Sequence, residues 1–320
     1  MTPERSTKEK ILALFTVTII FLLVGNLLFL ISLDNKKITE TLNNKILKIK
    51  ADHEIALDFE KIHLATSSLP NITSKAYLTL AVGDGEQIKI LIQKNPDLPL
   101  PIASITKLMV AVIILENVDL NTEVTATLDY IGKDESAFVL ETNRKYKVKE
   151  LLYNALIASD NDSARLLSST LGENNFLDKM NLKAKELGLT QTKFANVTGL
   201  DPILPATGIN LSTATDLANL LIYIKNNHPE ILKITTNTNY IFCDINNYCK
   251  DATTTDKLLE NNDIQYKIIG GKTGNTDLAG KNLVLMTELT DNMSLINVVL
   301  GSENNFTDTV SLINNVKVQN

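Results

Sequence analysis

The uncharged stretch that runs from Ile11 to Leu33 places the strongest restriction on this chain. As a helix it would span roughly 35 Å, enough to cross the roughly 30 Å hydrocarbon core of a bilayer. Arg5, Lys8 and Lys10 precede it, which favours a cytoplasmic N-terminus. No small-x-small cleavage site follows, so the sequence predicts an uncleaved signal anchor rather than a cleaved signal peptide.

This anchor suggests a division of the chain into four parts. We expect a cytoplasmic tail (1–10), a transmembrane segment (11–33), a juxtamembrane stalk of mixed charge (34–70) and one extracytoplasmic domain (71–320). With 320 residues, 44% of them hydrophobic, the chain can bury a substantial core. Its net charge of −6 and the lack of a basic stripe argue against a nucleic-acid partner.

The two cysteines, Cys243 and Cys249, flank Asn246 and Asn247, a pair that suits a tight turn. An extracytoplasmic location permits a disulfide across such a hairpin, although two free thiols would fit the sequence as well. The three histidines have no metal-ligand spacing to one another or to a cysteine. We therefore expect no metal and no cofactor.

The pattern of strands and helices predicts one α+β domain. Segments 76–82 and 87–93 are rich in β-formers, and the apolar run 102–118 reads as a buried helix that begins near Ala103. Strands return at 265–271, 281–289 and 294–301, and an amphipathic segment follows at 305–316. Four further helical patterns lie in between, at 148–159, 161–171, 174–187 and 213–227. Strands at both ends of such a domain are expected to share one sheet.

Ser104 and Lys107 stand three residues apart at the start of the buried helix, so one helix face would carry both side chains. A serine hydroxyl is a weak nucleophile and needs a base within hydrogen-bond distance. A lysine becomes such a base when burial or a second cation, for which Lys272 is a candidate, lowers its pKa. Ser-x-x-Lys is a weak signal alone, because a surface serine with a nearby lysine arises by chance.

Two further short motifs follow. Ser159 and Asn161 lie between two helical patterns, where polar side chains can project into a cleft or cap the second helix. Lys272 and Thr273 follow a predicted edge strand and suit a carboxylate ligand, since one supplies charge and the other a directed hydrogen bond. Glycines beside them, including Gly274, leave room for an extended peptide.

Ser-x-x-Lys, Ser-Asp-Asn and Lys-Thr-Gly, in this order, resemble the active-site motifs of the penicillin-recognising serine enzymes. The wider similarity is to the D-alanyl-D-alanine carboxypeptidases, the low-molecular-weight penicillin-binding proteins, over residues 75–315. It rests on five ordered blocks: ASITKLM, LLYNALIASDNDSA, KFANVTGLD, STATDLANLL and GGKTGNTDLAG. The resemblance implies a five-stranded antiparallel sheet flanked by helices, with an inserted, mostly helical subdomain, as in β-lactamases and transpeptidases.

The same resemblance implies a role for each motif. Ser104 would be acylated and Lys107 would act as its general base, while Ser159 would relay a proton to the leaving D-alanine. Substrate binding would fall to Asn161 for the peptide backbone and to Lys272, Thr273 and Gly274 for the terminal carboxylate. Backbone N–H groups of Ser104 and Asn275 would form the oxyanion hole.

The expected activity is that of a membrane-anchored D-Ala-D-Ala carboxypeptidase acting on peptidoglycan stem peptides, with β-lactam antibiotics as covalent inhibitors. A D,D-endopeptidase of the same family remains an alternative, because about 46 residues follow Gly274 in this sequence and we expect no room there for the β-rich domain that many members carry after the catalytic one. A class A β-lactamase is disfavoured, because no Glu-x-x-Leu-Asn motif lies between Asn161 and Lys272. A catalytically silent wall-binding module is the remaining reading. Asp160 departs from the small residue more common in the family, and its effect on Lys107 is open.

Overall fold

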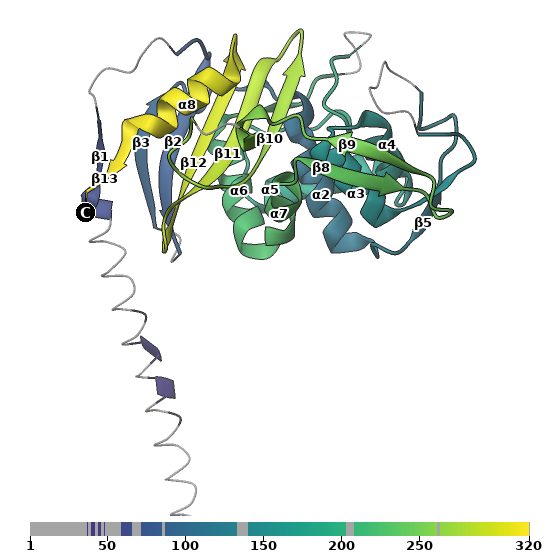
Figure 1. The fold of residues 1–320 in the computed structure, drawn as a ribbon, viewed down its shortest axis with the longest axis horizontal. Helices are drawn as coiled ribbons and strands as arrows, with labels where there is room; N and C mark the ends of the chain where they lie inside the picture. The colour runs from purple at the N-terminus through teal and green to yellow at the C-terminus, as the bar shows by residue number, and fades with distance from the viewer. Residues whose placement is uncertain are drawn as a thin grey trace, which may run out of the picture. The chain divides into compact units, whose positions relative to one another are not determined.

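The computed structural model describes residues 37, 40–41, 44–45, 48, 59–65, 72–84, 87–132, 140–202, 208–260 and 263–319 (Figure 1). The chain divides into two compact units, Met1–Leu57 and Asp58–Asn320. In the first unit the described residues are helical. The predicted transmembrane segment (11–33) lies outside the described residues, and none of the described helices has the length and apolar character to cross a membrane.

The second unit is built on a five-stranded antiparallel sheet with the strand order β10-β11-β12-β2-β3. Strands from opposite ends of the chain therefore lie side by side, which confirms the predicted α+β class and the shared sheet. Their bounds are Ala76–Gly83 for β2, Ile88–Lys94 for β3, Ile268–Thr276 for β10, Gly280–Thr290 for β11 and Met293–Ser302 for β12.

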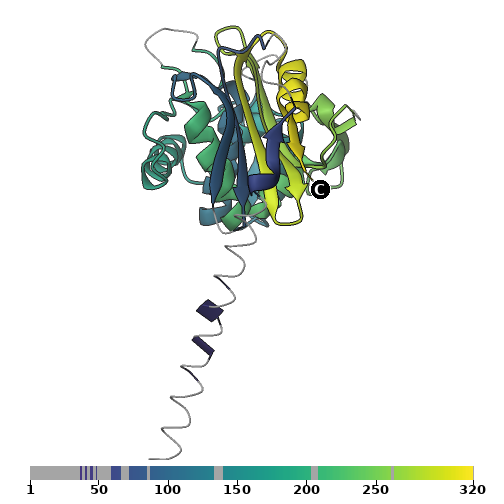
Figure 2. The same cartoon turned by 90° about the vertical axis from the view of Figure 1, so that its left-hand side faces the viewer.

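Helices cover both faces of this sheet, which explains why its central strands are apolar almost throughout. In β11, Leu283 and Leu285 contribute to one buried cluster and Val284 and Met286 to another, since successive side chains point to opposite faces. Helix α8 (Asn305–Asn315) packs against the first face, and α6 (Ala214–Asn227) packs against the second (Figure 2).

The helical part of the unit surrounds α2 (Thr106–Asn117), which is buried from Thr106 to Ile114. A helix that is hydrophobic on all sides is stable only inside a protein, and this one follows directly from the 3₁₀ turn η1 (Ala103–Ile105). The packed neighbours are α3 (Val148–Ile157), α4 (Asn161–Ser169), α5 (Glu173–Glu186) and α7 (Pro229–Thr235).

Short elements complete the unit. Three two-stranded pairs are formed by β4 (Leu100–Pro101) with β7 (Leu211–Ser212), β5 (Glu123–Thr125) with β6 (Lys145–Lys147), and β8 (Asn239–Cys243) with β9 (Cys249–Thr253). In the last pair Cys243 and Cys249 are joined by a disulfide. The 3₁₀ turn η3 (Lys257–Glu260) leads from β9 toward the sheet.

Two features differ from the expectations. The expected stalk (34–70) contains β1 (Ile62–Leu64), which pairs with β13 (Val316–Val318) and buries Ile62, so these residues belong to the second unit. Strand β10 does not end before the Lys-Thr-Gly motif but continues through it to Thr276, because the ladder to β11 extends to Gly280.

Candidate active site

Lys107 and Ser104 are brought together at the junction of α2 and η1. The Nζ atom of Lys107 donates a hydrogen bond of 2.8 Å to the Oγ atom of Ser104. It also donates to the Oδ1 atom of Asn161 at 2.8 Å and to the carbonyl oxygen of Thr198 at 3.0 Å. The lysine side chain is 1% exposed. The buried Lys107 amine therefore joins the half-buried Ser104 and Asn161 in one contact set, although the three come from different elements.

A loop that contains the block KFANVTGLD presents the third partner of this amine. The Oδ1 atom of Asn196 accepts hydrogen bonds from the backbone N–H groups of Thr198 and Gly199, which fixes the turn. Gly199 has a φ of +84°, and a Cβ there would lie 1.9 Å from the carbonyl oxygen of Ala103. A side chain at Gly199 would keep the loop from approaching the turn that carries Ser104 so closely.

Gly274 allows the same close approach from the other side. A Cβ at this position would lie 2.7 Å from the carbonyl oxygen of Ile102 and 3.2 Å from the backbone nitrogen of Ser104. Strand β10 thus passes directly against η1, and the backbone of Asn275 follows next along the strand. The glycine of the Lys-Thr-Gly motif is therefore explained by packing between strand and turn.

Ser159 projects from the turn between α3 and α4, where it has a φ of +60°. This left-handed conformation is uncommon for residues other than glycine. Asp160 follows as the N-cap of α4, and its carboxylate accepts the backbone N–H of Ser163 at 2.6 Å. The side chain of Asp160 is thus turned toward its own helix and buried, so the Ser-Asp-Asn motif both caps α4 and presents Ser159 and Asn161.

A second lysine–serine pair lies beside the first. The Nζ atom of Lys272, in β10, donates to the Oγ atom of Ser159 at 2.8 Å and to the carbonyl oxygen of Thr273 at 3.1 Å. Burial lowers the pKa of Lys272 to about 7, against the opposing influence of the Asp256 carboxyl. Burial in turn raises the pKa of Asp256, which the Lys272 charge opposes. Near neutral pH this amine can therefore exchange its proton.

Thr273 reaches the same space as the serines and shares a hydrogen bond with the hydroxyl of Thr255. Thr255 lies in the segment that follows β9, and its backbone N–H donates to the carbonyl oxygen of Ile157 at the end of α3. The disulfide-closed hairpin β8–β9 is therefore followed within two residues by a side chain of the site.

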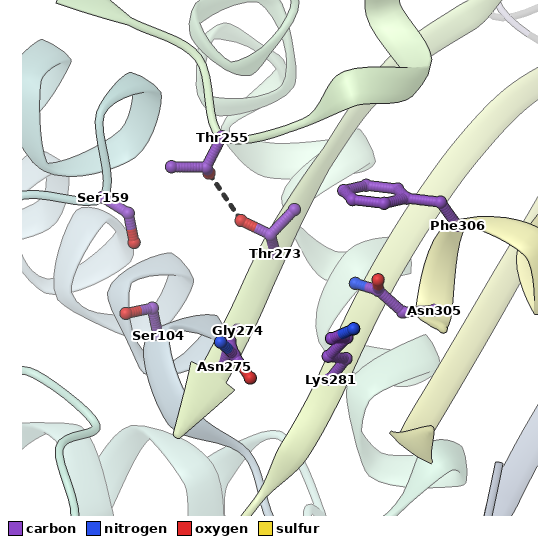
Figure 3. Close-up of a pocket in the computed structure, with 9 residues that line it drawn as sticks. All are labelled: Ser104, Ser159, Thr255, Thr273, Gly274, Asn275, Lys281, Asn305 and Phe306. Carbon is purple, nitrogen blue, oxygen red and sulfur yellow. Dashed lines mark hydrogen bonds between the residues drawn. The ribbon is translucent and has the colours of Figure 1, made fainter. Parts of the chain in front are cut away.

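These side chains line a cavity of about 350 Å³ (Figure 3). Ser104 and Ser159 lie on one side of β10, which contributes Thr273, Gly274 and Asn275, and Lys281, Asn305 and Phe306 lie on its other side. The volume is within the range of small-molecule sites. Its lining in full is Ser104, Ser159, Thr255, Thr273, Gly274, Asn275, Lys281, Asn305 and Phe306.

The structure thus gathers all eight candidate site residues around one cavity. Five of them line it. The other three are linked to the lining by hydrogen bonds: Lys107 to Ser104, Asn161 to Lys107, and Lys272 to Ser159. Sequence reasoning missed Thr255, Lys281, Asn305 and Phe306. None of them lies in a motif, and only their tertiary positions bring them to the cavity. The Thr198 carbonyl was also missed, although its block KFANVTGLD carried the signal.

Known proteins resemble the chain over this whole region. The profile of the D-alanyl-D-alanine carboxypeptidase family, serine peptidase family S11, matches residues 63–304. A D-alanyl-D-alanine carboxypeptidase DacA from Haemophilus influenzae is 29% identical over 72% of this chain and 58% of its own length. A D-alanyl-D-alanine endopeptidase from Pseudomonas aeruginosa is 31% identical over 72% of this chain and 74% of its own length.

A solved structure shows the same fold. Penicillin-binding protein D2 from Listeria monocytogenes, in its ampicillin-bound form, superimposes with a TM-score of 0.66 at 27% identity, covering 77% of this chain and 98% of that one. The five-stranded sheet with its flanking helices is accordingly the transpeptidase fold. Since the family profile matches residues 63–304, which include Ser104, both lysines and the cavity residues of β10, the chain belongs to the D-alanyl-D-alanine carboxypeptidase family of serine peptidases.

Proposed function

We propose that this protein is a serine-type D-Ala-D-Ala carboxypeptidase, which releases the terminal D-alanine of peptidoglycan stem peptides through an acyl-Ser104 intermediate. The observation that carries the proposal is the placement of the buried Lys107 amine 2.8 Å from the Ser104 hydroxyl. β-Lactam antibiotics would acylate the same hydroxyl and act as covalent inhibitors.

The surroundings of Lys107 suit a general base. The carbonyl oxygens of Asn161 and Thr198 can only accept hydrogen bonds, so in the neutral amine the two N–H bonds point to them. The lone pair then points toward the Ser104 hydroxyl. Proton transfer from Oγ to Nζ needs no movement of either residue, which is the geometry that activates a serine nucleophile.

Acylation would proceed as the Ser104 Oγ–carbon bond forms and the peptide C–N bond breaks. The backbone N–H groups of Ser104 and Asn275 would stabilise the developing oxyanion. Thr273 and protonated Lys272 would bind the terminal carboxylate. The Ser159 hydroxyl would give a proton to the departing amine and regain one from Lys272, 2.8 Å away. Water then attacks the ester, the bond between its carbonyl carbon and the Ser104 Oγ breaks, and protonated Lys107 returns the proton to Ser104, while the proton of the water leaves with the carboxylic acid.

We further propose that the protein is anchored in the cell membrane by residues 11–33, with the second unit on the extracytoplasmic face. This part of the proposal is supported by the uncharged stretch and the cations before it. Peptidoglycan lies on that side of the membrane, so the location matches the substrate.

The test uses full-length protein, a fluorescent penicillin and a pentapeptide that ends in D-Ala-D-Ala. We expect covalent labelling and release of D-alanine, both of which are lost in Ser104→Ala and retained in the control Ser169→Ala. Among the described residues, the hydroxyl that this control removes bonds within its own helix, to the carbonyl of Leu166. Labelling that persists in Ser104→Ala would assign the nucleophile to another residue, and an unlabelled wild-type protein would refute the proposed activity.

A further inference from the structure

Asn282 in β11 is a buried amide to which the proposed reaction gives no role. Its Nδ2 atom donates to the carbonyl oxygen of Pro101 at 2.9 Å, and its Oδ1 atom accepts the backbone N–H of Gly301 at 2.7 Å. Its own carbonyl oxygen accepts a hydrogen bond of 2.8 Å from the side chain of Asn305. The residue is 0% exposed. Asn282 thus links β11 to the end of β12, to the start of α8 and to the segment that leads into η1.

Asn282 supports the turn of the nucleophile together with Gly274. The two are register partners in the ladder between β10 and β11, so their Cβ positions lie on the same side of the sheet. Gly274 comes close to the carbonyl oxygen of Ile102 and to the backbone nitrogen of Ser104 because it has no Cβ. The amide of Asn282 bonds to the carbonyl oxygen of Pro101, one residue earlier. The turn η1 is therefore held against the sheet by a close contact with β10 and by a hydrogen bond from β11.

The turn needs such support, because its backbone is strained. Ala103 has a φ of +49°, a left-handed conformation that is uncommon for residues other than glycine. A conformation of this kind persists only where the surrounding contacts hold it in place. One restraint is the backbone N–H of Ile102, which donates to the carbonyl oxygen of Asn210 at 3.2 Å. The bond from Asn282 to Pro101 is a second restraint, and it comes from the sheet.

The position of the turn decides the geometry of the oxyanion hole. In the proposed reaction its two N–H groups belong to Ser104, in η1, and to Asn275, in β10. Their separation depends on how η1 is seated against the sheet. Such donors are effective at about 2.7–3.1 Å from the oxyanion, and a misplacement of about 1 Å can lower a rate by about 100-fold. A small movement of η1 away from β10 is therefore enough to impair acylation.

We propose that Asn282 is a positioning residue for the oxyanion hole, which holds the backbone N–H of Ser104 at the distance from that of Asn275 that a tetrahedral intermediate requires. The inference rests on the proposed function and adds a residue that lies in none of the three motifs and is not among those that line the cavity. Because Asn282 acts on the donors of the oxyanion, its loss weakens stabilisation of the transition state more than binding of the ground state.

Acylation of the full-length protein by a fluorescent penicillin tests this role. We expect Asn282→Ala to lower the first-order rate constant at saturating penicillin by about 10- to 100-fold, less than the roughly 100- to 1000-fold lost when an oxyanion donor is removed. The Kd of the complex that precedes acylation should change by less than about threefold. Asn282→Val, which suits a strand and leaves a smaller void, should show the same loss of rate. Unfolded molecules reduce the amount of label but not the rate constant of the folded ones, so instability does not imitate the effect.

A peptide boronic acid that ends in the boron analogue of D-alanine gives a second readout. Its boron binds the Ser104 oxygen as a tetrahedral adduct and places an oxygen in the oxyanion hole, so its affinity follows the stabilisation of the transition state. We expect the Kd of this adduct to rise by about 10- to 100-fold in Asn282→Ala, in proportion to the loss in acylation rate.

Asn297→Ala is the matched control. Asn297 is also 0% exposed, lies in the neighbouring strand β12 and accepts a hydrogen bond from the Thr79 hydroxyl at 2.9 Å. Its replacement leaves a buried hydroxyl without this partner, so we expect a fall in Tm similar to that of Asn282→Ala. The acylation rate constant should stay within about twofold of wild type, because the two sites are independent.

The outcomes separate this inference from the function on which it rests. Acylation of both Asn282 variants at the wild-type rate overturns the positioning role and leaves the carboxypeptidase intact. An equal loss of rate in Asn297→Ala, or a change in the Kd before acylation that accounts for the whole loss, overturns it as well. Absence of penicillin labelling and of D-alanine release in the wild-type protein overturns both.

Discussion

The two buried lysines of the site differ in the charges that surround them. Lys107 is held by Ser104 and by two carbonyl oxygens, whereas Lys272 lies near the buried carboxyl of Asp256. Because burial lowers the pKa of Lys272 to about 7, the charge of this lysine changes near physiological pH. In its protonated form Lys272 can bind a carboxylate or give a proton to Ser159, and in its neutral form it can take a proton back.

Replacement of this amine should change the pH dependence of stability. The folded pKa of Lys272 is below the ordinary value of 10.5, so between pH 7 and about 10.5 the unfolded chain binds more protons than the folded chain. The resulting penalty on the wild-type protein is full below pH 7 and disappears as the pH rises to about 10.5. Lys272→Met carries no such penalty at any pH.

We therefore expect the Tm of Lys272→Met, relative to wild type, to be highest near pH 7 and to fall by several degrees by pH 10. Each pKa unit corresponds to about 1.4 kcal/mol, and about 1 kcal/mol shifts the Tm of a domain of this size by about 2–4 °C. Calorimetry at a series of pH values measures the difference. A difference that stays constant from pH 7 to pH 10 would show that Lys272 titrates normally.

At the scale of single elements, the hairpin β8–β9 connects a disulfide to the site. Cys243 and Cys249 close a short loop. Shortly after Cys249, the Thr255 hydroxyl shares a hydrogen bond with the Thr273 hydroxyl of the site. Replacing both cysteines with serine should lower the free energy of unfolding by about 2 kcal/mol, the value expected for so small a loop. The corresponding fall in Tm is about 4–8 °C.

The same double variant should slow acylation by a fluorescent penicillin by less than about tenfold, since Thr255 is also held by its backbone bond to Ile157. A reducing agent should produce the same fall in Tm in the wild-type protein and none in the double variant. Equal stability of the two proteins under oxidising conditions would contradict a stabilising role for the bridge.

The elements also show what the sequence could and could not predict. Helix α2 and strands β11 and β12 were predictable, because long apolar runs allow few alternatives. The continuation of β10 through Gly274 was not, because glycine and asparagine are depleted in strands and pairing with β11 decides the outcome. The seven-residue helix α7 was missed for a related reason, since so short a pattern is not distinguishable from a loop.

At the scale of the whole second unit, the site lies where the sheet meets the helical part. Ser104 comes from the entry to α2, Ser159 from the turn between α3 and α4, and Lys272 from the edge strand β10. Motifs identified these residues because their chemistry requires fixed spacings. Lys281 and Phe306 belong to no motif, and they line the same cavity because α8 packs beside β11.

The pairing of β1 with β13 joins residues from the two ends of the second unit, and neither strand contributes a residue to the motifs or to the cavity. Ile62 is 4% exposed, Val316 is fully buried, and the Lys89 amine donates to the carbonyl oxygen of Phe59 at 2.7 Å. These contacts lie with the α8 side of the sheet, in the buried cluster that also contains Leu312. Stability and acylation should therefore respond differently to the loss of β1.

A fragment that begins at residue 72 should be less stable than one that begins at residue 58, because it loses Ile62 and the ladder to β13. Loss of one buried isoleucine side chain alone costs about 2–5 kcal/mol, so we expect the Tm to fall by at least about 5 °C. The substitution Ile62→Ala in the longer fragment should reproduce much of this fall.

At 20 °C, where both fragments are folded, their rates of penicillin acylation should agree within about twofold, because no residue of β1 lines the cavity. Equal melting temperatures would show that β1 adds nothing to the unit, and a large loss of acylation in a folded fragment would show that the pairing supports the site.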